Sequence, residues 1–137
     1  MLFETNTIVG HRGCRIVDQN NTLEAFEKAL AVGAEMVEMD LRKTRDDVLV
    51  VFHDRDIKGV RIRGNLYEDM AALANESGLV LPVLEEVLEK LENRAQIIVE
   101  LKESGYEEKA MVTLLKHFQP DQFVVTVTSS ARPIMPG

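Results

Sequence analysis

Short apolar runs that alternate with segments of helical periodicity are the feature that most limits how this chain can fold. An apolar run of about four to eight residues, bounded by turn residues, is typical of a buried strand. Strands that alternate with helices form parallel βα units, so the pattern predicts an α/β fold with about five parallel strands. The expected strands cover residues 8–10, 36–41, 49–52, 96–101 and 123–128.

The helices between these strands have recognisable starts and ends. Asn21 is the expected N-cap of the first helix, with Glu24 three residues later as in a capping box, and Gly33 ends that helix. His117, near the end of the last helix, is expected to be a surface residue at the negative end of the helix dipole. Further helices are expected at residues 67–74, 82–91 and 106–118.

Carboxylates are placed at the ends of two of the expected strands. Residues two apart in a strand point to the same face, so Glu38 shares a face with Asp40, and Glu100 shares a face with Lys102. Any one of these charges could be an ordinary surface residue paired with a lysine or arginine. Three carboxylates at the same end of the sheet need cations, because a buried carboxylate without a partner is costly.

Two histidines follow apolar runs in the same way. His11 stands in the run His-Arg-Gly after the first expected strand, and His53 stands in the pair His-Asp after the third. An imidazole titrates near neutral pH and can act as a general acid or base. Together with the carboxylates, these histidines indicate a metal-assisted phosphodiester hydrolase.

Composition excludes some partners and locations. The 137 residues carry a net charge of −7, with 45% hydrophobic and 28% charged residues. These values predict one globular domain. Two prolines and the lack of a helical period predict an irregular tail at 129–137, so the domain covers residues 1–128. The negative charge argues against a nucleic-acid partner. No apolar stretch could span a bilayer, and a single cysteine fits a reducing compartment, so we expect a cytoplasmic location.

The charged motifs resemble those of the glycerophosphodiester phosphodiesterases, a family of the phospholipase-C-like phosphodiesterase superfamily. The resemblance spans residues 8 to 102 in the family's order, and it implies a TIM-type β/α barrel that hydrolyses glycerophosphodiesters to glycerol 3-phosphate and an alcohol. The matching segments are His11-Arg12-Gly13, the helix start at 21–26, the strand at 33–40, the His-Asp segment at 50–54 and Glu100-Leu101-Lys102.

The chain departs from the family pattern in two ways. Asn20 stands where the family has a glutamate before the first helix, and the family barrel runs to about 250 residues. The resemblance therefore implies a partial, half TIM-type barrel. Five strands cannot close a barrel, and an open edge offers unpaired backbone groups, so we expect a homo-oligomer or a complementing half-barrel.

The resemblance also implies a role for each site residue. Glu38, Asp40 and Glu100 are the expected metal ligands, and their oxygens favour a divalent cation such as Mg²⁺ or Ca²⁺. Arg12 and Lys102 are expected to bind the substrate phosphate.

His11 and His53 are the expected general acid and base, and the sequence leaves open which is which. One histidine would deprotonate the glycerol 2-hydroxyl, which attacks phosphorus, and the other would protonate the leaving alcohol. Water would then open the cyclic phosphate. Two alternatives stay open: a non-catalytic half-barrel that binds a metal or a partner chain, and a related phosphodiesterase acting on lysophospholipid or sphingolipid head groups.

Overall fold

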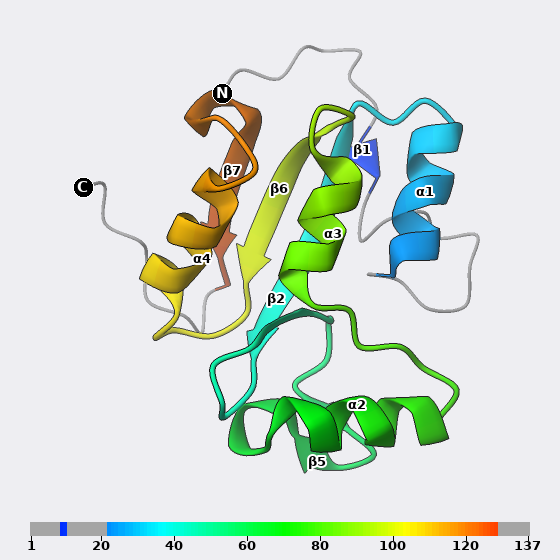
Figure 1. Cartoon of the computed structure of the whole chain (residues 1–137), viewed down its shortest axis with the longest axis vertical. Coiled ribbons are helices and arrows are strands. Elements are labelled where there is room, and N and C mark those ends of the chain that lie inside the picture. The colour runs from blue at the N-terminus through cyan, green and yellow to red at the C-terminus, as the bar shows by residue number, and fades with distance from the viewer. Residues whose placement is uncertain (1–8, 11–21, 129–137) are drawn as a thin grey trace.

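A five-stranded sheet forms the centre of the computed structural model, which describes residues 9–10 and 22–128 (Figure 1). The sheet strands are β1 (Val9–Gly10), β2 (Met36–Lys43), β3 (Leu49–Val51), β6 (Gln96–Leu101) and β7 (Phe123–Val127). The helices are α1 (Leu23–Ala31), α2 (Tyr67–Glu76), α3 (Leu84–Leu91) and α4 (Glu107–Leu115), with 3₁₀ turns η1 (Ile62–Gly64) and η2 (Pro120–Gln122). A separate small hairpin pairs β4 (Asp56–Ile57) with β5 (Val60–Arg61).

Parallel pairing runs across the sheet in the order β1-β2-β6-β7. Helices connect these parallel strands and cover one face of the sheet (Figure 1). This arrangement confirms the prediction of a partial β/α barrel.

Strand β3 departs from the prediction that all five strands are parallel, because it pairs antiparallel with β2. Only residues 44–48 separate the two strands, and a parallel crossover needs a dozen or more residues. Thr44 closes the turn: its hydroxyl accepts a hydrogen bond from the Val48 amide at 3.1 Å and donates one to Asp46 at 2.6 Å. The hairpin therefore turns the chain back along β2.

The main core lies between the sheet and the helices α1, α3 and α4. On β2 and β6 the odd-numbered residues point into this core, because side chains alternate along a strand. The even-numbered residues, which include all the predicted site residues of these strands, point to the opposite face. The core residues of the two strands are Val37, Met39, Leu41, Ile97, Val99 and Leu101.

A second apolar cluster supports the segment between β3 and α3. It packs Phe52 and Ile57 against Ile62 of η1 and Met70 of α2. Figure 1 shows α2 and β5 beyond the carboxyl end of β2, so this segment covers the end of the sheet where the predicted site lies. None of the helices within the described residues is long and apolar enough to cross a bilayer.

The start of helix α1 differs from the prediction by one residue. Thr22, rather than Asn21, is the N-cap, and its hydroxyl accepts a hydrogen bond from the Ala25 amide at 3.0 Å. Both residue types favour this position, so sequence alone did not separate them. Asn21 itself lies outside the described residues.

Candidate functional site

A lysine and two carboxylates meet at the carboxyl ends of β2 and β6. Asp40 and Glu100 are register partners on the two parallel strands. The ammonium of Lys102 lies 2.7 Å from Glu100 Oε2 and 3.5 Å from Asp40 Oδ1. The Asp40 side chain is only 2% exposed, so a nearby cation offsets its desolvation.

The three predicted metal ligands share this face of the sheet. Glu38 lies two residues before Asp40 on β2, and is therefore on the same face. All three offer oxygen atoms, which are the ligands that hard cations prefer, so the donor chemistry fits Mg²⁺ or Ca²⁺. Within residues 9–10 and 22–128, no three histidine, cysteine, aspartate or glutamate side chains converge as a metal-ligand group. The arrangement of the three carboxylates around one ion therefore stays a prediction.

His53 lies near the carboxylates because the β2–β3 hairpin returns the chain along β2. The Phe52 amide donates a hydrogen bond to the Asp40 carbonyl at 3.0 Å, so His53 follows directly beside Asp40 of β2. Its Nδ1 lies 2.8 Å from Asp54 Oδ1, and its imidazole is 45% exposed. A carboxylate can only accept, so this contact favours the proton on Nδ1 and leaves Nε2 for chemistry.

Two residues next to His53 were not predicted as part of the site. Asp54 orients the imidazole, and Arg42 donates hydrogen bonds from Nη2 and Nε to the His53 carbonyl at 2.7 and 3.3 Å. The sequence held a signal for both: Asp54 is adjacent to the histidine, and Arg42 lies two residues after Asp40 and therefore on the same face.

Tyr106 connects β2 to the loop after β6. Its hydroxyl donates a hydrogen bond to the Leu41 carbonyl at 2.7 Å and accepts one from the Glu103 amide at 3.1 Å. Burial raises the pKa of Tyr106 to about 12, so the hydroxyl keeps its proton at neutral pH. The Arg63 guanidinium lies 6.0 Å from the centre of the ring, and so links the segment between β3 and α3 to the loop after β6.

Other predicted site residues cannot be placed. His11 and Arg12 lie outside the described residues, as does Asn20. Strand β1 pairs parallel with β2, with Gly10 opposite Val37. The described part of the predicted site therefore consists of Glu38, Asp40, His53, Glu100 and Lys102.

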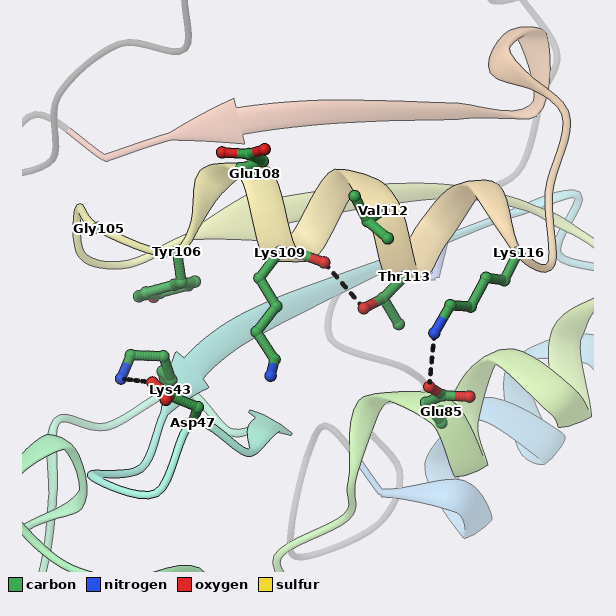
Figure 2. Close-up of a pocket in the computed structure, with 10 residues that line it drawn as sticks. All are labelled: Lys43, Asp47, Glu85, Gly105, Tyr106, Glu108, Lys109, Val112, Thr113 and Lys116. Atoms are coloured by element: carbon green, nitrogen blue, oxygen red, sulfur yellow. Dashed lines mark hydrogen bonds and ion pairs between the residues drawn. The ribbon is translucent and has the colours of Figure 1, made fainter.

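A cavity of about 580 Å³ lies on the helical side of the sheet, away from the carboxylate face (Figure 2). Figure 2 shows Lys109 pointing from α4 toward the turn that carries Lys43 and Asp47. Two charged pairs line the cavity: Lys43 lies 2.7 Å from Asp47, and Lys116 lies 3.8 Å from Glu85. Its position and balanced charge separate it from the candidate active site.

His117 is less exposed than the sequence predicts, with 14% of its side chain accessible. Its Nδ1 lies 2.8 Å from Glu92 and its Nε2 lies 3.3 Å from Glu85, so it joins the end of α4 to α3. The hydrogen bond to Glu92 is the main cause of a raised pKa for His117, with Glu85 adding to it. His117 lies just after α4, as expected, but it is only partly exposed because α3 packs beside it, which the helix dipole alone does not show.

A partial parallel barrel with carboxylates, a lysine and a histidine at the carboxyl ends of its strands has the site placement of barrel enzymes. The described residues thus define a β/α-barrel protein with a polar site at that end. The chain belongs to the glycerophosphoryl diester phosphodiesterase family, whose family model matches residues 11–120.

Individual relatives agree with this family. A glycerophosphodiester phosphodiesterase from Bacillus altitudinis is 34% identical over 86% of this chain and 56% of the relative. The crystal structure of a glycerophosphodiester phosphodiesterase from Agrobacterium tumefaciens has 25% identity and a TM-score of 0.79, over 90% of this chain and 58% of that one.

A phosphodiesterase from Oleispira antarctica, solved with the product sn-glycerol-3-phosphate, has the same fold, with 21% identity and a TM-score of 0.73, over 88% of this chain and 57% of that one. The chain thus spans little more than half the length of these relatives.

Proposed function

We propose that this chain carries the catalytic half of a metal-dependent glycerophosphodiester phosphodiesterase, which releases glycerol 3-phosphate and an alcohol. The observation that supports this most is the convergence of Asp40, Glu100 and Lys102, with His53 brought to the same edge by the β2–β3 hairpin. Family membership points to the same chemistry. The bound sn-glycerol-3-phosphate of the Oleispira antarctica relative supports a small glycerophosphate product.

His53 and His11 are the proposed acid–base pair. Asp54 holds the Nδ1 side of the His53 ring, so Nε2 is the atom that would take or give the proton. The substrate's own glycerol hydroxyl attacks phosphorus while the P–O bond to the alcohol breaks, and the alcohol leaves with a proton. Water then opens the cyclic phosphate, so every proton removed is returned.

Glu38, Asp40 and Glu100 are the residues that would hold a divalent cation, with Mg²⁺ and Ca²⁺ as the candidates. When bound, the cation would neutralise charge on the phosphate oxygens. Lys102 and Arg12 would bind the phosphate from the protein side. Lys102 suits this role because its ammonium already lies among the carboxylates of the site.

The partner and the location are part of the same proposal. The substrate is a small molecule, and no nucleic acid is involved. A second copy of the chain, or a complementing half-barrel, would pair with the edge of β7, which has no further strand beside it among the described residues, and would complete the pocket wall. If so, activity should rise faster than linearly with protein concentration, and strict proportionality would separate assembly from catalysis. The single cysteine supports the cytoplasm.

The test is release of glycerol 3-phosphate from glycerophosphocholine by the full chain with added Mg²⁺ or Ca²⁺. Glu100→Gln removes one site charge, and Glu89→Gln removes an exposed charge on α3 as the matched control. The proposal expects turnover that needs the cation, is lost in Glu100→Gln and is kept in Glu89→Gln. Equal turnover by both variants would contradict the assignment of the site.

The rival function is a non-catalytic half-barrel. Asn20 favours it, because this residue stands where the family has a glutamate. Calorimetry separates the two: cation binding without turnover supports the rival. The same assay with lysophosphatidylcholine as substrate tests the alternative of a phosphodiesterase that acts on lysophospholipids. Turnover of lysophosphatidylcholine but not of glycerophosphocholine would support that alternative.

A further inference from the structure

Arg42 is a buried guanidinium whose short contacts, among the residues that the structure describes, go to one backbone carbonyl. It lies on β2 two residues after Asp40, and 11% of its side chain is exposed. Its Nη2 and Nε donate to the His53 carbonyl at 2.7 and 3.3 Å. A rigid fork that grips one acceptor with two nitrogens restricts both the position and the direction of that peptide unit.

Glu103 supplies the opposite charge without taking these hydrogen bonds. Its Oε2 lies 3.6 Å from Arg42 Nη1, and its side chain is 16% exposed. A guanidinium beside a carboxylate usually makes two parallel short hydrogen bonds to it. Here the carboxylate offsets the buried charge, while the fork is directed at His53. The loop that carries Glu103 is itself fixed, because the Tyr106 hydroxyl accepts from the Glu103 amide.

His53 is therefore attached to β2 on both sides. On the amino side, the Phe52 amide donates to the Asp40 carbonyl at 3.0 Å. On the carboxyl side, the His53 carbonyl accepts from Arg42. These two attachments span the backbone that carries the imidazole. The imidazole itself is 45% exposed and contacts Asp54 through Nδ1.

We propose that Arg42 is a positioning residue for His53, a role that rests on the proposed function of His53 as acid or base. Arg42 touches neither the substrate nor the reacting atoms in this assignment. It holds the backbone of His53 beside Asp40 of β2, so the imidazole keeps its alignment with the carboxylate cluster. Since a shift of about 1 Å in a catalytic group can cost about 10²-fold in rate, loss of this attachment should lower kcat.

Three variants of the full chain test the role. Arg42→Met removes the fork and the charge, and Arg42→Lys keeps the charge beside Glu103 but cannot form the fork. Arg45→Met is the control, because Arg45 is exposed in the turn after β2. We expect kcat to fall about 10- to 100-fold in both Arg42 variants with KM nearly unchanged, and to stay at the wild-type value in the control.

Chemical rescue adds a measurement whose result a purely structural role of Arg42 would not affect. Millimolar guanidinium should restore part of the kcat of Arg42→Met, and sodium chloride at the same ionic strength should not. Arg42 variants with the kcat of Arg45→Met, or equal effects of the two salts, would overturn the proposal.

Hydrogen exchange measured by NMR decides the same question without activity. The Phe52 amide should exchange at least about tenfold faster in Arg42→Met and Arg42→Lys than in wild type, and should be unchanged in Arg45→Met. If the wild-type chain hydrolyses no glycerophosphodiester, the proposed function fails while this exchange result still reports on the attachment of His53. Unchanged exchange in the Arg42 variants overturns the positioning role whatever the activity.

Discussion

Replacing Lys102 by methionine removes the ammonium that lies between two carboxylates on neighbouring strands. Asp40 and Glu100 then face each other across the β2–β6 pair, and Asp40 is only 2% exposed. Removing one partner of a fully buried ion pair costs about 3 to 5 kcal/mol. Glu100 is 23% exposed and partly screened, so we expect Lys102→Met to lower the free energy of unfolding by about 2 to 3 kcal/mol.

Urea denaturation of the variant, with and without a divalent cation, measures this cost. A cation that binds the folded chain at 100 times its Kd should restore about 2.7 kcal/mol. The double variant Asp40→Asn/Lys102→Met should also regain stability, because one of the facing charges is gone. Lys90→Met, an exposed change on α3, is the control and should stay within about 0.5 kcal/mol of wild type. A Lys102→Met chain as stable as the control would refute this electrostatic reasoning.

Three further predictions follow from the described contacts. His117 has a raised pKa in the folded state, so its stabilisation is complete below the unfolded pKa of about 6.5 and is lost as pH rises through the folded pKa. His117→Gln should therefore cost about 1 kcal/mol at pH 5.5 and less at pH 8.5 in urea titrations, whereas a pH-independent cost would contradict the ion pairs with α3. Tyr106→Phe leaves a buried carbonyl of β2 without this donor and should cost about 1 to 2 kcal/mol in the same assay; no change would mean that water replaces the hydroxyl. Thr22→Ala removes the N-cap of α1 and should lower the thermal midpoint through a loss of about 1 kcal/mol, and an unchanged midpoint would remove Thr22 as a stabilising cap.

Periodicity predicted the strands and helices well because burial follows side-chain alternation. The even-numbered residues of β2 and β6 share the face that the sequence assigned to them, and Asp40 lies opposite Glu100. The predicted direction of β3 was wrong. The short turn after Lys43 was visible in the sequence, and a turn of that length excludes a parallel crossover. Apolar character indicates a strand but not its direction.

Contacts between segments far apart in the sequence were beyond prediction. Nothing in the local sequence of Arg42 indicates that its fork reaches the carbonyl of His53, because the contact depends on how the hairpin folds back. The contacts of His117 with Glu92 and Glu85 were not predicted, because these partners lie 25 and 32 residues earlier in the chain. Such pairs are set by helix packing rather than by local pattern.

The central claim is that His53 performs proton transfer in phosphodiester hydrolysis. Phosphorus NMR of glycerophosphocholine, incubated with the full chain and Mg²⁺ or Ca²⁺, tests it most directly. Wild type and His117→Ala should both form glycerol 3-phosphate at similar rates, because His117 lies between α3 and α4 away from the site. His53→Ala should be slower by about 10² to 10⁴ while keeping its fold. Product formation by His53→Ala at the wild-type rate would contradict the account.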